Sequence, residues 1–288
     1  MSSPLQGTHP PLCLTVGTMQ SSPGQVPAKH YGPHWNIPVP VWLFFRFAMW
    51  IYTFSWCIYG GIKGGSPKWL VYFTNLTYTL MSAYYMVAAV NLMAAVLYKY
   101  ISTCCTVNRL GPDVPEVAWS SPPAPALPNC ILISLRFQWL LHSVTSTSAV
   151  IVSLIYWTVI YSTEKWEVVD TSINMHLTNI LQVLLELMLS SIPIHLLHVL
   201  YPFIYGVLYI SFTVIYWAVG TANGQEGPAV YLVLNYGERP LLASGSAVGF
   251  LVVLIPLSHL FIWSVSLLRE YLILKLSNWC KCRVMPTP

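Results

Sequence analysis

Residues 241–268 read LLASGSAVGFLVVLIPLSHLFIWSVSLL, a stretch without Lys, Arg, Asp or Glu. An apolar run of 18 or more residues is long enough to cross the hydrocarbon core of a bilayer as a helix. This stretch therefore predicts a transmembrane helix. Further apolar runs occur along the chain, which predicts a protein with several membrane spans.

The composition of the whole chain indicates the same class of protein. Of 288 residues, 56% are hydrophobic and 8% are charged, whereas charged residues make up about 25% of ordinary soluble domains. The apolar runs do not alternate with polar residues as the strands of a membrane β-barrel do. We therefore expect an all-α, polytopic membrane helical bundle. The net charge of +4 is too small and too scattered to indicate nucleic-acid binding.

About six segments are long and apolar enough to be transmembrane helices. Because lipid offers no hydrogen bonds to the backbone, each span must be helical. We place the spans at about residues 41–59, 69–97, 131–161, 171–189, 196–219 and 241–268.

The remaining segments predict tails and a loop around a transmembrane domain of residues 37–270. Residues 1–36 are rich in Pro, Ser, Gly and Gln and predict a disordered N-terminal tail. Residues 98–130 predict an irregular, Pro-rich loop, and residues 271–288 predict a C-terminal tail.

Basic residues predict the orientation, because they are enriched on the cytoplasmic side of a membrane. Six spans put both termini and the 98–130 loop on one side. That side carries nine Lys and Arg residues, if Arg46 and Arg136 extend to it from just inside their spans, and the other side carries four. We therefore expect an integral, multi-pass protein of the plasma membrane or endoplasmic reticulum, with both termini in the cytoplasm.

Four cysteines follow the second and sixth spans on the predicted cytoplasmic side. They are Cys104, Cys105, Cys280 and Cys282. Juxtamembrane cysteines are candidates for palmitoylation, and plain reduced thiols are the alternative.

Few ionisable residues lie within the spans, and such residues are functional candidates because they are costly in lipid. They are His142, His176, Glu186 and His259. His176 lies about five residues, or about 7–8 Å, inside the fourth span. Thr74 lies at the same depth in the second span, which enters from the same side. The topology thus places a hydroxyl and an imidazole at one level, where they meet if the two helices pack together.

Polar residues near this pair recur every three or four positions, so they share one face of each helix. They are Asn179, Gln182 and Glu186 in the fourth span, and Thr77, Tyr78, Ser82 and Tyr85 in the second. Histidine can take the proton of a threonine hydroxyl and turn it into a nucleophile. The alternative is a structural hydrogen bond between the two helices.

Two stretches resemble the rolling stone family of multi-span membrane proteins, which is named for a myoblast-fusion protein. Residues 68–80 read KWLVYFTNLTYTL, and residues 174–210 read NMHLTNILQVLLELMLSSIPIHLLHVLYPFIYGVLYI. The resemblance covers most of residues 35–270. It implies a membrane protein of that type, with a role in cell adhesion or fusion.

More remotely, the chain resembles the androgen-induced family of membrane threonine hydrolases. That family has a Trp followed by Phe/Leu-Thr in one span, and Met-His-x-Thr with a Glu ten residues after the His in another. Here Trp69 precedes Phe73-Thr74, and the Met-His-Leu-Thr of residues 175–178 precedes Glu186. The family's Tyr-Pro-x-Leu element reads Tyr-Leu-Val-Leu at residues 231–234, without the proline.

This resemblance implies a lipid-ester hydrolase with Thr74 as nucleophile and His176 as general base, open toward the outer leaflet. The nearest residues by depth that could stabilise the oxyanion are Asn75, Tyr78 and Asn179. Glu186 matches the family's acidic position. The implied substrate is a fatty-acyl ester taken from the lipid bilayer.

Other functions compete with hydrolysis. A non-enzymatic protein of cell adhesion or fusion would use Thr74 and His176 structurally, and a transporter or channel would need a continuous polar path. His195 and His198 could share a metal on a helix, but no third ligand is evident. The histidines in the spans do not form the facing pairs of a di-haem protein. We therefore expect no metal, no cofactor and no nucleic acid, and the sequence indicates no particular protein partner.

The orientation can be tested with cysteines introduced at Ser162 and Ser277. We expect an impermeant thiol reagent on intact cells to label Ser162→Cys and not Ser277→Cys, because residues 162–170 face the exterior or lumen. Permeabilised cells, in which both positions are reached, are the control. Labelling of Ser277→Cys alone would reverse the orientation.

Overall fold

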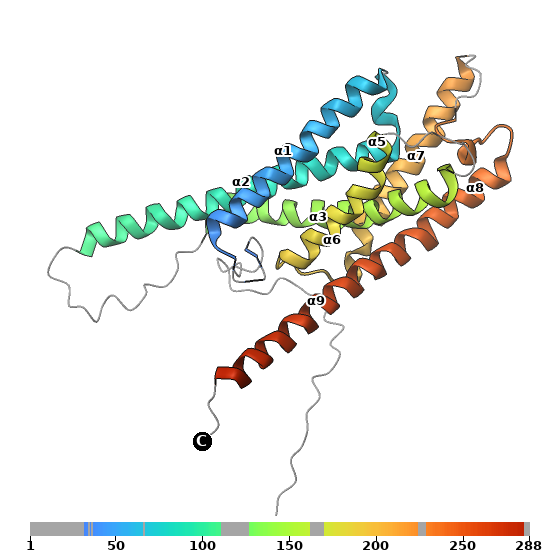
Figure 1. The fold of residues 1–288 in the computed structure, drawn as a ribbon. Coiled ribbons are helices and arrows are strands. Elements are labelled where there is room, and N and C mark those ends of the chain that lie inside the picture. The colour runs from blue at the N-terminus through green and yellow to red at the C-terminus, as the bar shows by residue number, and fades with distance from the viewer. Residues whose placement is uncertain are drawn as a thin grey trace, which may run out of the picture.

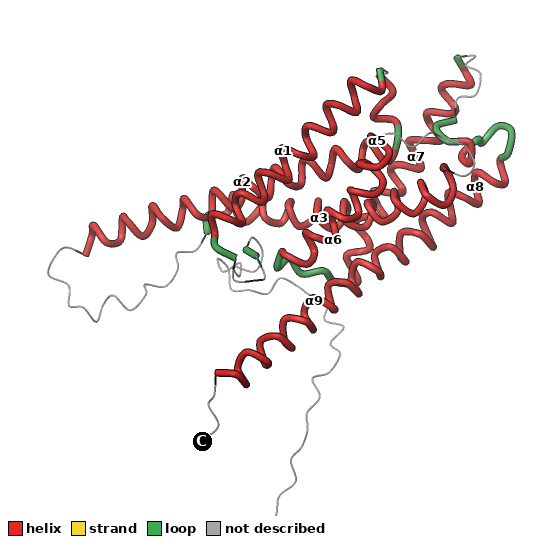
Figure 2. Tube along the Cα trace, viewed as in Figure 1, coloured by secondary structure: helices red, strands yellow, loops and turns green. Residues whose placement is uncertain are grey.

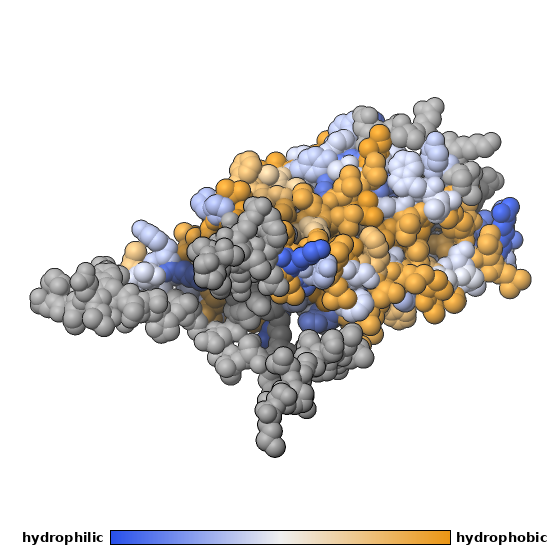
Figure 3. All heavy atoms as spheres, turned by 60° about the horizontal axis from the view of Figure 1, so that its bottom comes forward, coloured by the Kyte–Doolittle hydropathy of each residue, from blue (hydrophilic) through white to orange (hydrophobic). Residues whose placement is uncertain are grey.

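The computed structural model describes residues 32, 33, 35, 37–65, 67–110, 127–161, 170–223 and 229–284. Within these ranges the chain forms helices joined by short loops, and no strand is present (Figures 1 and 2). Apolar side chains cover most of the bundle on the face shown in Figure 3. The prediction of an all-α polytopic bundle is confirmed.

The helices follow the predicted spans, and three of them contain π-helical segments. The elements are α1 (Val39–Gly64), α2 (Phe73–Leu110), α3 (Asn129–Ile155) continued by the π-helical η4 (Tyr156–Ile160), α5 (Asp170–Ile173) continued by the π-helical η5 (Asn174–Thr178) and α6 (Asn179–Leu189), α7 (Leu200–Ala222), and α8 (Pro240–Gly249) continued by the π-helical η8 (Phe250–Leu254) and α9 (Ile255–Val284). Three short 3-10 turns are η2 (Pro67–Val71), η6 (Leu196–Val199) and η7 (Leu232–Leu234).

In the described part of the chain, five helical runs are long and apolar enough to cross a membrane. They are Val39–Gly64, Phe73–Cys105, Asn129–Val159, Leu196–Ala222 and Pro240–Leu276. The predicted span at 171–189 is helical in three consecutive pieces of 4, 5 and 11 residues. Together these pieces are about 30 Å long, close to the thickness of a bilayer core. This run is the most polar of the six predicted, and it is not among the five apolar runs.

Helix α3 is the centre of the bundle and contacts α2, α6, α7 and α9 (Figure 1). Of its most apolar stretch 78% is buried, against 17% for α1 and 22% for the run that contains α7. Residues 142–149 read HSVTSTSA and are all buried. Small side chains allow helices to approach closely in membranes, and their hydroxyl groups can bond inside the protein. This composition explains why α3, and not a more apolar helix, lies inside.

The connection from α1 to α2 sets the position of Thr74. Helix α1 ends at Gly65, which has a φ of 56°, a left-handed conformation that glycine adopts without strain. The 3-10 turn η2 follows and leads directly into α2. Thr74 is therefore the second residue of α2, in its first turn.

Helices α2 and α9 continue beyond the boundaries expected from hydropathy. α2 extends to Leu110 instead of residue 97, and α9 extends to Val284 instead of residue 268. The C-terminal parts of both helices project from the bundle (Figure 1). Hydropathy marks where a helix leaves an apolar environment and not where its hydrogen bonding ends. Residues 111–126 of the predicted 98–130 loop lie outside the described residues.

The end of the segment predicted to be a disordered tail contacts the end of α6. The indole N–H of Trp35 donates to the carbonyl of Met188 at 2.7 Å. The hydroxyl of Ser191 donates to the carbonyl of Gly32 at 2.9 Å. The Met188 carbonyl lies in the last turn of α6 and has no partner within the helix. The remainder of the tail, up to residue 31, falls outside the described residues.

Arg46 does not extend to the membrane surface as expected, because it has an acidic partner inside the protein. Its guanidinium lies 2.6 Å from the carboxylate of Glu186, and both side chains are fully buried. The Tyr84 hydroxyl donates to the same carboxylate at 2.7 Å, and the Trp42 ring lies 4.4 Å from the guanidinium carbon. This ion pair connects α1 to α6. Arg136 is exposed.

Removal of one member of the Arg46–Glu186 pair should destabilise the protein strongly. Glu186→Gln leaves a buried cation without its counter-charge, which costs about 3–5 kcal/mol. The double variant Arg46→Met/Glu186→Gln should recover part of that loss, because it removes both charges. Thermal unfolding of the purified protein in detergent measures both effects. Arg136→Met is the control, and a double variant less stable than Glu186→Gln would contradict the prediction.

Candidate functional site

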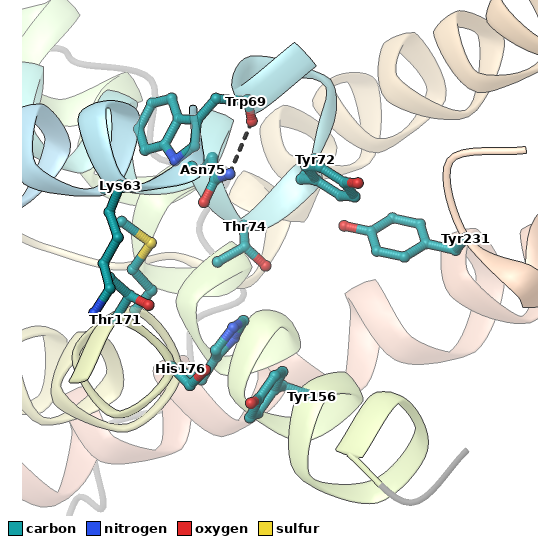
Figure 4. Close-up of a pocket in the computed structure, with 13 residues that line it drawn as sticks. Lys63, Trp69, Tyr72, Thr74, Asn75, Tyr156, Thr171, His176 and Tyr231 are labelled. Carbon is teal, nitrogen blue, oxygen red and sulfur yellow. Dashed lines mark hydrogen bonds between the residues drawn. The ribbon is translucent and has the colours of Figure 1, made fainter. Parts of the chain in front are cut away.

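A pocket of about 340 Å³ lies where the α1–α2 connection meets η4 and the start of the α5–η5–α6 run. Thr74 and His176, the two residues paired by depth in the sequence, both line it. Figure 4 shows the Thr74 side chain between the imidazole of His176 and the ring of Tyr231. The pocket therefore joins residues that are about one hundred positions apart in the chain.

Thr74 lies at the positive end of the α2 dipole. The first backbone N–H groups of a helix have no carbonyl one turn earlier to bond with. In α2 the first of them, from Phe73, donates to the hydroxyl of Tyr231 at 3.1 Å. The next two, from Thr74 and Asn75, belong to pocket-lining residues. The half-buried Thr74 hydroxyl thus lies beside hydrogen-bond donors of the backbone.

His176 is held in place by an aromatic ring that stacks on its imidazole and by a hydrogen bond to its backbone carbonyl. Its imidazole lies parallel to the Tyr156 ring, with centroids 3.6 Å apart and planes 5° apart. The hydroxyl of Ser153 donates to the His176 carbonyl. The side chain is 8% exposed, and its Nδ1 atom has no hydrogen-bond partner among the described residues. The result is a buried imidazole that lines the pocket and has one nitrogen without a partner among the described residues.

The Thr74 hydroxyl and the His176 ring face the same opening (Figure 4), but no hydrogen bond between them is found in the described part of the chain. A structural Thr–His hydrogen bond is therefore not formed here. Catalytic hydrogen bonds are often long in the absence of substrate and shorten when substrate binds. Both groups therefore line the pocket without a direct bond between them.

A second cavity, of about 460 Å³, adjoins the pocket and shares Thr74 and Tyr231 with it. Its other lining residues are mostly apolar and come from the start of α2, α3–η4, α7, the η7 loop and α8–η8: Phe73, Val152, Ile155, Val159, Tyr209, Ile210, Val233, Leu234, Ser246, Gly249, Phe250, Val253 and Leu254. Thr74 thus stands where the pocket that holds His176 meets a more apolar cavity.

All three π-helical segments border these two cavities. η5 supplies His176, η4 supplies Tyr156 and Val159, and η8 supplies Phe250. A π turn holds an extra residue, which widens the helix locally, and such turns are frequent at functional sites. Their concentration around Thr74 is typical of a functional site.

The other predicted site residues divide into two groups. Asn75 lines the pocket, but its amide N–H donates to the Trp69 carbonyl at 2.8 Å, so it braces the pocket wall. Tyr78, Asn179 and Glu186 are buried within the bundle and do not line the pocket. The structure therefore brings together Thr74, Asn75 and His176.

Two aromatic residues of the site were not found from the sequence. Tyr156 lies in an apolar run, where nothing distinguishes it from a core residue. Tyr231 was noted only as part of the element that lacks a proline. Its ring packs edge to face on Tyr72 with centroids 5.9 Å apart. It therefore fastens the η7 loop to the start of α2.

The histidines near the turn after α6 form hydrogen bonds with protein groups. His259 contacts the Thr147 hydroxyl at 3.0 Å and the His195 carbonyl at 3.1 Å. The His195 N–H donates to His198 at 3.2 Å. Among the described residues, no three His, Cys, Asp or Glu side chains are grouped so that they could hold a metal ion.

Comparison with curated proteins finds a match to the protein rolling stone of Drosophila melanogaster, with 24% identity over 106 residues. The match covers 36% of this chain and 38% of the Drosophila protein. No protein-family model matches the chain, and no solved structure matches it. The apolar helices support an integral, multi-pass membrane protein, and 36% of the chain is similar to rolling stone.

Gly60 lines the pocket, and because glycine has no side chain, Met175 can pack against it. A Cβ atom there would lie 2.6 Å from the terminal methyl of Met175, which would have to move, whereas a Cβ at Gly61 meets nothing within 4 Å. Alanine is favoured over glycine within a helix by about 0.5–1 kcal/mol. We expect Gly61→Ala to gain that stability and Gly60→Ala to be less stable than Gly61→Ala in thermal unfolding. Equal gains would show that the contact has no energetic importance.

Proposed function

We propose that this chain is a rolling stone-type membrane protein that hydrolyses lipid esters, with Thr74 as nucleophile and His176 as general base. One observation carries the proposal: a buried imidazole, unbonded at Nδ1 within the described protein, shares a pocket with a hydroxyl at the junction with an apolar cavity. A nucleophile needs a base within reach, and the base needs a fixed orientation. The Tyr156 stack supplies that orientation.

In the proposed reaction, the Thr74 hydroxyl oxygen attacks the ester carbonyl carbon while its proton passes to His176. The tetrahedral intermediate then collapses, the bond to the alcohol oxygen breaks, and the alcohol takes the proton from His176. A water molecule attacks the acyl-threonine with His176 again as base. This step releases the fatty acid and restores the free hydroxyl.

The negative oxygen of the intermediate needs hydrogen-bond donors placed in advance. The backbone N–H groups of Thr74 and Asn75, in the first turn of α2, are the candidates closest to the nucleophile. Asn75 itself uses its side-chain amide on Trp69. We therefore assign the oxyanion role to the helix end rather than to the Asn75, Tyr78 or Asn179 side chains.

The substrate proposed is a fatty-acyl ester, because the second cavity offers apolar walls next to Thr74. Burial of each methylene contributes about 0.8 kcal/mol, so a long chain supplies much of the binding energy. The bilayer is the source of such molecules. With both termini in the cytoplasm, as the basic residues predict, the pocket opens toward the outer or lumenal leaflet of the plasma membrane or endoplasmic reticulum.

Thr74→Val tests the proposal, since valine keeps the shape of threonine and removes the hydroxyl. We expect turnover of long-chain lipid esters by the purified protein to fall by a factor of about 10³ or more. Loss of one hydrogen bond in a membrane protein costs only about 0.6 kcal/mol, so expression should stay near normal. His176→Ala should lose turnover as well.

The matched control is Thr79→Val, on the same helix. Its hydroxyl donates to the Asn75 carbonyl at 2.8 Å and lies outside both cavities, so turnover should be retained. Equal turnover by wild type and Thr74→Val would reject hydrolysis at this site. A cell adhesion or fusion role that survives Thr74→Val would then favour the non-enzymatic alternative.

A further inference from the structure

The inner face of the α5–η5–α6 run carries a polar stripe that begins at the pocket and continues into the bundle. Its members are His176, Asn179, Gln182 and Glu186, and each is less than 9% exposed. From His176 to Glu186 the stripe is about 15 Å long at 1.5 Å per residue. It ends at the Arg46–Glu186 ion pair.

Polar atoms without a hydrogen-bond partner are concentrated along this stripe. The described residues contain 13 such buried side-chain atoms. Eight of them lie on the stripe or at its Arg46 end: His176 Nδ1, Asn179 Oδ1, Gln182 Oε1 and Nε2, Glu186 Oε2, Arg46 Nε and Nη2, and His142 Nε2. Elsewhere buried amides are paired, as in the 2.9 Å bond between Asn91 and Gln138.

Helix α2 forms the opposite wall of the stripe with three buried tyrosines. The Tyr78 hydroxyl accepts a hydrogen bond from the Asn174 side chain at 2.9 Å. The Tyr85 hydroxyl approaches the Gln182 carbonyl at 3.5 Å. The Tyr84 hydroxyl bonds Glu186, and its ring lies 5.3 Å from that of His142. Five of the eight polar atoms thus lie along one helix interface, and the other three, from Arg46 and His142, lie at its Arg46 end.

The energetic cost of this arrangement points to its occupant. An unpaired buried polar group costs about 1–3 kcal/mol, so eight atoms left unpaired would offset the stability of an ordinary domain. Lipid offers no hydrogen bonds. Buried water molecules, which make about three hydrogen bonds each, are the usual partners of such groups in proteins.

We propose that the interface between α2 and α6 holds a chain of internal water molecules from His176 to the Arg46–Glu186 pair. A metal is a poor alternative because the described residues supply no three-ligand group, and a lipid chain would leave the polar atoms unpaired. Hydrogen-bonded water passes protons from molecule to molecule. The chain therefore gives the buried imidazole a route for proton exchange that does not use the pocket mouth. It does so whether or not the pocket is catalytic.

Radiolytic hydroxyl labelling of the purified full-length protein in detergent, read by mass spectrometry, tests the proposal. Radicals generated from bound water modify the side chains beside it. Tyr78 and Tyr85 are 0% and 1% exposed, so bulk water does not reach them. We expect both to be modified at doses that modify Tyr100, which is 69% exposed. Absence of modification at Tyr78 and Tyr85 under those doses would overturn the proposal.

Two matched variants show whether the stripe holds the water. Gln182→Leu replaces an amide of the stripe and should lower labelling of Tyr78 and Tyr85 at least about threefold. Gln138→Leu removes an equally buried amide whose partner is Asn91, and it should leave that labelling unchanged. Labelling that persists in Gln182→Leu would reject the stripe as the water site. If Gln182→Leu does not fold, the wild-type comparison with Tyr100 decides.

Discussion

Lipid cannot satisfy a polar group, and this constraint determines how the α5–η5–α6 run is placed. A helix with an imidazole, two amides and a carboxylate on one face must turn that face toward protein. The partners available are the tyrosines of α2, the guanidinium of Arg46 on α1 and the hydroxyl-rich helix α3. Because α3 has small side chains, it can lie at the centre and bring these helices together. The pocket forms where this arrangement reaches the first turn of α2.

The candidate site combines two environments that single helices do not provide. One side of Thr74 faces a pocket with an imidazole, backbone N–H groups and tyrosine hydroxyls, and the other side adjoins a cavity with apolar walls. An ester of a fatty acid has the same division between a polar reacting group and a long apolar chain. The two sides of the site thus match the reacting group and the apolar chain of the proposed substrate.

The sequence predicted the features that follow from hydropathy and helical spacing. Long apolar runs predict the helices of the bundle. Thr74 and His176 were predicted to lie at equal depth from the same side of the membrane, and both line one pocket. Arg46 was misjudged because its position near a span end suggested surface access, while its partner lies 140 residues away in the chain. Tyr156 and Tyr231 were missed for a related reason: aromatic residues in apolar segments look alike until their neighbours in space are known. The π-helical segments have no signal in residue periodicity.

These π turns have a genetic consequence. A π turn corresponds to an α-helix that has gained one residue, so a single-codon deletion in η4, η5 or η8 would restore an ordinary helix. Such a deletion would leave the hydropathy profile and the number of spans almost unchanged, yet it would rotate every side chain on one side of the deletion relative to the cavities. Chain length at three positions therefore determines which side chains face Thr74. Two relatives with the same span pattern can consequently differ in the chemistry of this site through one gap in their alignment.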